Sequence, residues 1–155
     1  MLTILDTNVV SGLRQPRRDP RLTAWLAVQL SDEIALASFT VTEIEFGIAQ
    51  RPKADAFASQ LTEWLDRIVA TNRILPLEAE AARLLGRMYA TPALRHLATT
   101  HPDMVRPRFG GDLIIAATAI AHAGRVATRN VRDFKLIAHH FTELRGIDPF
   151  TGSEF

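Results

Sequence analysis

Short apolar runs alternate with amphipathic stretches along this sequence, and this alternation limits the possible folds more than any other feature. Buried strands are expected at residues 2–5, 34–39, 74–75 and 125–128, with a last edge strand at 141–144. Strands that alternate with helices are typical of a parallel sheet covered by helices on both faces. We therefore expect one domain, residues 1–155, with three α/β/α layers around a mostly parallel sheet of four to five strands.

Helix boundaries are marked by capping residues, prolines and glycines. Asp19-Pro20 can begin a helix, and Pro52 can begin another. Thr40 and Glu43 fit a capping box that opens a helix to about residue 51. Gly124 is expected to end the helix that starts at Asp112. The remaining stretches are expected to be a helix at 77–90, a loop or short helix at 91–111, and a turn at 130–134.

Acidic residues lie beside several of the apolar runs, where burying an unpaired carboxylate costs several kcal/mol. They are Asp6, Glu43, Asp112 and Asp133. Asp6 and Asp133 follow predicted strands. Glu43 lies near the start of the helix after the second strand, and Asp112 at the start of the helix before the fourth. In parallel sheets, ligands bind outside the carboxyl ends of the strands. We therefore expect all four carboxylates at one edge of the sheet, where a bound cation would make their grouping tolerable.

Each acid also has an ordinary structural interpretation. Asp6 can be a turn or cap residue in LDTNV, and Glu43 can simply close the capping box. Asp112 can be an N-cap after two glycines, and Asp133 a turn residue. Taken singly, these interpretations are at least as good as a functional one. Taken together, they require four independent coincidences at one sheet edge.

The kinds of side chain available decide which cation would suit this site. Cysteine is absent, and the five histidines show no metal-binding spacing. Carboxylates alone favour hard cations such as Mg²⁺ or Mn²⁺. The formal net charge is +1, so gathering four acids in one place would leave arginine in excess elsewhere. A basic rim of that kind suits a phosphate polymer, although arginine usage can equally reflect genome composition.

Nothing in the sequence indicates a membrane or an exported protein. The longest apolar stretch, residues 113–121, is too short to span a bilayer. No basic start followed by an apolar run marks a signal peptide. The absence of cysteine fits a reducing compartment, so we expect a cytoplasmic location.

With these segments in place, the sequence resembles the PIN-domain nucleases, and most closely the VapC- and FitB-like toxins of bacterial toxin–antitoxin pairs. The resemblance runs in order through MLTILDTNVV, FTVTEIEFGIA and DLIIAATAIAHAGRVATRNVRDF. Asp6, Glu43, Asp112 and Asp133 fall on the family's acidic positions, and Thr7 and Asn8 match its polar pair. Two departures stand out. Asn130 replaces an acid that some members carry, and the 91–111 segment, with its unassigned Asp103, is long and rich in proline.

The resemblance implies a metal-dependent ribonuclease that is neutralised by an antitoxin. Asp6 and Asp112 would hold the main Mg²⁺ or Mn²⁺ ion, and Glu43 and Asp133 would complete the site. Neighbouring polar groups would orient these acids or hold phosphate; they are Thr7, Asn8, Thr128, Arg129 and Asn130. Other arginines that could grip the RNA backbone are Arg106, Arg108 and Arg132. Apolar stripes at 52–72 and 77–90 could bury a homodimer contact or a partner helix, or could be plain core.

Two other functions stay open at this point. The chain could be a PIN-like domain that binds a basic partner segment through its acids without catalysis. It could also be an aspartate-nucleophile phosphatase with Asp6 as the nucleophile. Those enzymes have a second Asp two residues later, where this chain has Asn8, so the phosphatase is the weakest of the three.

Overall fold

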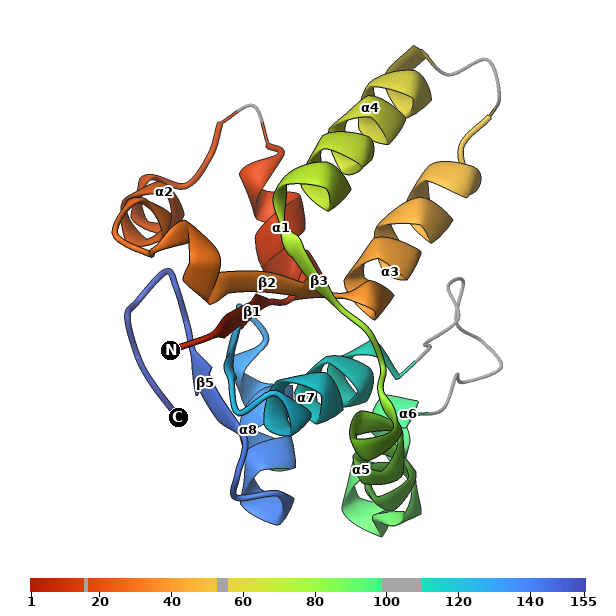
Figure 1. Ribbon diagram of the computed structural model, residues 1–155, viewed down its shortest axis with the longest axis vertical. Coiled ribbons are helices and arrows are strands. Elements are labelled where there is room, and N and C mark those ends of the chain that lie inside the picture. Colours follow the sequence, from red (N-terminus) through yellow and green to blue (C-terminus); the bar gives the residue numbers. More distant parts are fainter. Residues whose placement is uncertain (16, 53–55, 99–109) are drawn as a thin grey trace.

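A five-stranded parallel sheet forms the centre of the protein in the computed structural model, which describes residues 1–15, 17–52, 56–98 and 110–155 (Figure 1). The strands are β1 (Thr3–Leu5), β2 (Ile34–Ala37), β3 (Arg73–Leu75), β4 (Arg125–Ala127) and β5 (Arg145–Ile147). Their order in the sheet is β3-β2-β1-β4-β5, and all four pairings are parallel. In this order β1 is the central strand, so the residue that follows it lies in the middle of the sheet edge.

Helices connect the strands and cover both faces of the sheet. They are α1 (Thr7–Leu13), α2 (Pro20–Ala27), α3 (Ser38–Ala49), α4 (Ala56–Thr71), α5 (Ala79–Ala90), α6 (Arg95–Ala98), α7 (Gly111–Ala121) and α8 (Val131–His140), with short 3-10 turns η1 (Ser31–Glu33) and η2 (Pro92–Leu94). Figure 1 shows α1 to α4 on one side of the sheet and α5 to α8 on the other. The predicted three-layer α/β/α fold is confirmed.

Successive strand residues supply the cores on opposite faces of the sheet, as the two-residue repeat of a strand requires. Ile4 of β1 and Val126 of β4 pack in the core beneath α5 to α8. Leu5 and Ala127, the next residues along, pack in the core beneath α1 and α2. Because both faces are buried, the strands read as continuous apolar runs, and this is why sequence patterning located most of them.

The start of α3 differs from the prediction. β2 ends at Ala37 rather than Phe39, and Ala37 is already the N-cap of α3. Thr40 and Glu43 therefore lie inside the helix, and the predicted capping box is wrong. Because Glu43 does not cap its own helix, its side chain is available for a contact with another helix.

The segment after β4 also differs from the prediction. Residues 130–134 are not a free-standing turn, because α8 begins at Val131 with Asn130 as its N-cap. The last strand is Arg145–Ile147, not 141–144. Its pattern contains Gly146, which obscures the strand signal. A Cβ at Gly146 would lie 2.1 Å from the Phe155 ring, so the glycine allows the C-terminal residues to pack against β5.

Glycines at the two ends of α7 act differently from one another. Gly110 is the N-cap, with φ of 68°, so Asp112 lies in the first turn rather than capping the helix. After the helix, the left-handed residue is Ala123 (φ 49°) and not Gly124. Gly124 is needed for close packing, because a Cβ there would lie 2.5 Å from Ile4 Cδ1.

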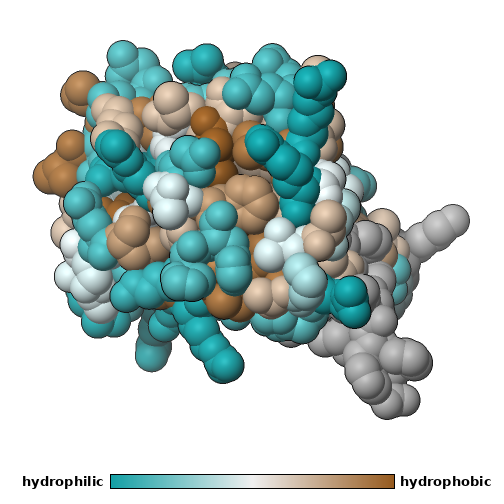
Figure 2. Space-filling view, turned by 90° about the horizontal axis from the view of Figure 1, so that it is seen from below, coloured by the Kyte–Doolittle hydropathy of each residue, from teal (hydrophilic) through white to brown (hydrophobic). Residues whose placement is uncertain are grey.

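Much of the two apolar helix stripes is core within this chain, although Phe57 and Val69 of α4 are exposed. Leu61 and Leu65 of α4 are buried against α3, and Leu84 and Met88 of α5 are buried against α7. On the face seen in Figure 2, apolar side chains lie scattered among hydrophilic ones. No helix in the described ranges is long and apolar enough to cross a membrane. Asp103, Arg106 and Arg108 lie outside the described residues.

Candidate functional site

Asp6 lies at the centre of the carboxyl edge of the sheet. It directly follows β1, and its backbone N–H donates to the carbonyl of Ala127 at 3.0 Å, which extends the β1–β4 ladder by one bond. Its side chain is only 3% exposed. The sheet therefore holds a nearly buried carboxylate in its middle.

Polar neighbours from α1 and from the residue after β4 orient the Asp6 carboxylate. The Thr128 hydroxyl donates to Asp6 Oδ2 at 2.6 Å, and the Asn8 amide donates to the same oxygen. Asn8 Oδ1 in turn accepts the backbone N–H of Arg129 at 3.1 Å. These bonds join the ends of β1 and β4 through side chains, so the orientation of Asp6 depends on both strands.

Asn130 links the two acids that follow in the chain. Its amide Nδ2 donates to Asp112 Oδ2 at 2.8 Å and to Asp133 Oδ2 at 3.0 Å. Its backbone N–H donates to Thr128 Oγ1 at 2.8 Å. In this way one amide holds the carboxylates of α7 and α8 on the same side as Asp6.

Glu43 reaches the same place from α3. Its Oε2 accepts a short hydrogen bond from the Thr7 hydroxyl at the start of α1. Its Oε1 packs against Gly111, where an added Cβ would come within 2.7 Å of that oxygen and 2.9 Å of Phe39 Cε1. A glycine is therefore required at the start of α7 for Glu43 to occupy this position.

We call Asp6, Glu43, Asp112 and Asp133 the acidic cluster, and burial raises the pKa values of three of its members. Burial, followed by the negative charges of Asp6, Asp133 and Glu43, raises the pKa of Asp112 to about 7. Burial, with a further contribution from Glu43, raises the pKa of Asp6 to about 6. The pKa of Glu43 is also raised, chiefly by burial. The four carboxylates thus lie at the sheet edge predicted from the topology, where the other three contribute to the pKa of Asp112.

The chemistry of this donor set fits a hard divalent cation. All the ligand candidates are carboxylate oxygens, and a positive ion would offset the desolvation and repulsion that raise the pKa values of Asp6 and Asp112. Among the described residues, no three acidic, histidine or cysteine side chains are grouped closely enough to hold an ion as they stand. Asn130 and Thr7 donate to oxygens of Asp112, Asp133 and Glu43 in this arrangement, so ion binding would require local side-chain rotation.

The structure brings together every polar residue predicted around the cluster. Thr7, Asn8 and Thr128 each bond directly to one of its carboxylates, and Asn130 bonds to two. Arg129 is tied in through its backbone, and its guanidinium lies over the Phe150 ring at 4.6 Å. The predicted roles of these residues in binding metal or substrate are not settled by their positions and stay predictions.

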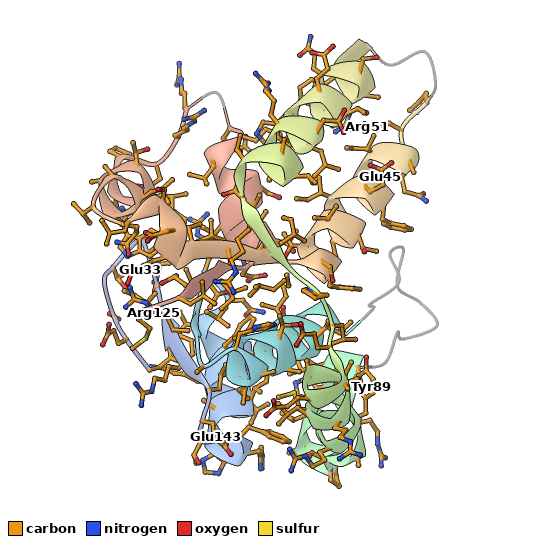
Figure 3. The ribbon with its side chains drawn as sticks, viewed as in Figure 1. Glu33, Glu45, Arg51, Tyr89, Arg125 and Glu143 are labelled. Atoms are coloured by element: carbon orange, nitrogen blue, oxygen red, sulfur yellow. The ribbon has the colours of Figure 1, made fainter. Side chains whose placement is uncertain are left out.

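Sequence reasoning missed residues that shape the start of α7. Tyr89 of α5 (labelled in Figure 3) packs on Gly110, where an added Cβ would lie 3.2 Å from the tyrosine hydroxyl. The Gly110-Gly111 pair was the available signal, but it pointed to a cap rather than to close packing. No local pattern marked Tyr89 or Phe150, because each meets the site from a distant part of the chain.

Comparison with known proteins adds independent information about most of the chain. Residues 3–139 match the family described as the PIN domain. The chain is 31% identical over 137 residues to the VapC ribonuclease Y4jK of Sinorhizobium fredii, an alignment that covers 86% of this chain and 91% of that protein. It is 30% identical over 136 residues to Toxin FitB of Neisseria gonorrhoeae, with the same coverage of 86% and 91%.

The fold also matches a solved structure over nearly its full length. A chain in the structure of FitAB bound to an IR36 DNA fragment has a TM-score of 0.74 with this protein, at 26% sequence identity. The superposition covers 96% of each chain. The likeness therefore extends over nearly all of the architecture described above.

Proposed function

The chain belongs to the PIN-domain family, and on that premise we propose that it is a ribonuclease toxin that hydrolyses RNA phosphodiester bonds at the acidic cluster and is neutralised by a cognate antitoxin. Two relatives, which are 31% and 30% identical to this chain, are named a VapC ribonuclease and a toxin. The single observation that carries the proposal is the convergence of four carboxylates at one sheet edge, with the pKa of Asp112 raised by burial and by the other three acids.

We further propose that the reaction depends on Mg²⁺ or Mn²⁺ held by Asp6 and Asp112, with Glu43 and Asp133 completing the site. When bound there, the cation supplies Lewis acidity and neutralises charge that develops on the phosphate. In the overall reaction, water adds to phosphorus and the bond to the 3′ oxygen breaks. The products are a 5′-phosphate and a 3′-hydroxyl.

The chain's own hydrogen bonds contribute by fixing the acids before substrate arrives. The Thr128 hydroxyl and the Asn8 amide hold Asp6 by one oxygen, and Asn130 spans Asp112 and Asp133. Groups that are already oriented lose little freedom when the reaction begins. Neutral amides and hydroxyls do this without cancelling the negative charge that a cation needs.

A cleavage assay with purified protein and single-stranded RNA tests the proposal. We expect cleavage with Mg²⁺ or Mn²⁺, loss of cleavage in excess EDTA, and at least about a hundredfold lower rate in Asp112→Asn. Glu154→Gln, which removes an acid at the opposite edge of the sheet, is the matched control and should cleave like the wild type. Equal cleavage by Asp112→Asn, or undiminished cleavage in EDTA, would contradict the proposal.

The acidic cluster also suits the proposed antitoxin. The fold matches a chain in the structure of FitAB bound to DNA, and the relative FitB is named a toxin. A basic side chain from a partner would satisfy the same carboxylates that a cation does. We therefore propose that the antitoxin inserts an arginine or lysine there. A non-catalytic domain that only binds such a segment is the alternative, and absence of RNA cleavage with intact binding of the antitoxin would favour it.

A further inference from the structure

Arg129 lies beside the acidic cluster, but its charge has the opposite sign. It stands between Thr128, which bonds Asp6, and Asn130, which bonds Asp112 and Asp133. Its backbone N–H is fixed by Asn8. The side chain is exposed, so a positively charged group leaves the backbone at the centre of the site and ends in solvent.

The Arg129 guanidinium is held in place by an aromatic ring rather than by an acid. Its central carbon lies 4.6 Å from the centroid of the Phe150 ring. Within the described residues, Arg129 forms no salt bridge. Asp19 is near enough to feel its charge, but both oxygens of Asp19 are engaged by Arg21, at 3.1 and 2.7 Å. The arginine is therefore oriented while its N–H donors stay unpaired by carboxylate.

Phe150 is itself fixed by the C-terminal segment. Its backbone N–H donates to Asp148 Oδ1 at 2.9 Å, and its ring packs on the core beneath α1 and α2. Beyond it, Phe155 exchanges two backbone hydrogen bonds with Gly146 of β5, at 2.8 and 3.0 Å. These contacts give the ring a defined position next to the carboxyl edge of the sheet.

We propose that Arg129, held against Phe150, binds a backbone phosphate of the RNA next to the bond that is cleaved, and that Phe150 is its positioning residue. This inference rests on the proposed ribonuclease function. An acidic cluster repels the phosphates on either side of the scissile one, so a fixed cation at its rim is needed to hold the strand. Guanidinium groups bind phosphate through paired N–H donors, and within the described residues Arg129 forms no salt bridge that would occupy its donors.

Steady-state cleavage of a short single-stranded RNA at several salt concentrations tests this inference. Arg129→Gln should raise KM about tenfold with kcat within about twofold of the wild type. It should also lower the salt dependence of log KM by ~0.7, the loss expected for one phosphate contact on a single strand. Arg129→Lys, which keeps the charge but not the planar stack, should keep the wild-type salt dependence with an intermediate KM.

Variants of Phe150 test the positioning role separately. Phe150→Leu keeps an apolar side chain but removes the ring, and it should raise KM about threefold. The double variant Arg129→Gln/Phe150→Leu should be no worse in KM than Arg129→Gln alone, because both changes remove one interaction. A Phe150→Leu protein that loses thermal stability and kcat, but keeps KM and salt dependence, would show a merely structural role and overturn this part.

Two controls separate the possible failures. Arg145→Gln also removes one positive charge, but at the start of β5, away from the acidic cluster. It should leave KM and salt dependence unchanged. Wild-type KM and salt dependence in Arg129→Gln, together with metal-dependent cleavage, would overturn the phosphate contact while the ribonuclease proposal stands. Absence of cleavage by the wild type would overturn both.

Discussion

The two edges of the sheet treat charge in opposite ways. At the carboxyl edge, four acids face one another and are held by neutral amides and hydroxyls. At the amino edge, Arg125 binds Glu154 at 3.0 Å and the Thr3 hydroxyl at 3.0 Å, and the N-terminal amine pairs with Glu33. Figure 3 labels Arg125 and Glu33 at this edge.

This difference separates charges that serve the fold from charges that serve chemistry. Opposite charges at an exposed edge contribute about 0–1 kcal/mol and leave nothing for a ligand to neutralise. Like charges that are buried together cost stability, and the cost is recovered only when a cation or a basic group binds. Perturbed acids of this kind gather at functional sites.

The largest expected effect that would sharpen this comparison is the pH dependence of stability without divalent cations. The folded pKa of Asp6 is raised from 3.8 to about 6, and that of Asp112 to about 7. Because the folded state holds protons that the unfolded state has already lost, the free energy of unfolding should fall as pH rises from about 4 to about 7. Asp6 alone accounts for about 3 kcal/mol of this fall.

Denaturant unfolding at several pH values in EDTA measures this fall. Mg²⁺ or Mn²⁺ should restore stability near pH 7 and have little effect near pH 4, where Asp6 and Asp112 are protonated. Glu154→Gln at the amino edge should show the same pH profile as the wild type. If the free energy of unfolding stayed constant over this pH range, the pKa values of Asp6 and Asp112 would not be raised in the folded protein.

A smaller effect on stability is expected from the substitution Gly111→Ala, which adds a methyl group at the start of α7. In Gly111→Ala the new Cβ would lie 2.7 Å from Glu43 Oε1 and 2.9 Å from Phe39, so Glu43 must move. We expect kcat/KM for RNA cleavage to fall about a hundredfold and stability to fall by about 1–3 kcal/mol.

The matched control is Gly86→Ala in the middle of α5, where an added Cβ meets nothing within 4 Å. It should keep full activity and gain about 1 kcal/mol in stability, because alanine favours a helix interior. If Gly111→Ala behaved like Gly86→Ala in both measurements, the packing of Glu43 on α7 would have no functional meaning.

The smallest effect is expected at the amino edge. Arg125→Gln removes a partly buried cation that binds Glu154 and Thr3, and it should lower the free energy of unfolding by about 1 kcal/mol. Glu154→Gln, at the exposed end of the same pair, should lower it by less than about 0.5 kcal/mol. Thermal unfolding measures both changes. RNA cleavage should be unaffected, and a loss of cleavage in Arg125→Gln would break the division between the two edges.

Much of the fold was predictable because buried parallel strands and amphipathic helices have strong local patterns. The runs around Ile4, Leu36 and Val126 were apolar without interruption, as strands covered on both faces must be. The last strand was misplaced because Gly146 breaks that pattern in favour of a contact with Phe155, nine residues further along the chain. Local sequence patterns fail to locate a strand where a residue in it is required by a contact with a residue further along the chain.

The candidate site was predictable in its members but not in its connections. The acids followed from their positions at strand and helix ends, whereas the pairing of β1 with β4, which places Asp6 beside Thr128, is known only from the structure. The capping-box interpretation of Glu43 was wrong because its partner, Thr7, lies on a different helix. Asn130 looked like a missing acid, whereas its amide joins Asp112 to Asp133.

The sequence by itself determined the layered α/β architecture, the family and the identity of the acids, because these depend on local periodicity and on residue types near strand ends. Only the tertiary structure decided how the acids are held, why Gly111 must lack a side chain, and that Phe150 lies beneath Arg129. These features depend on contacts between segments far apart in the chain. Their geometry is set when the sheet closes and the C-terminal residues pack against β5, and no local pattern encodes it.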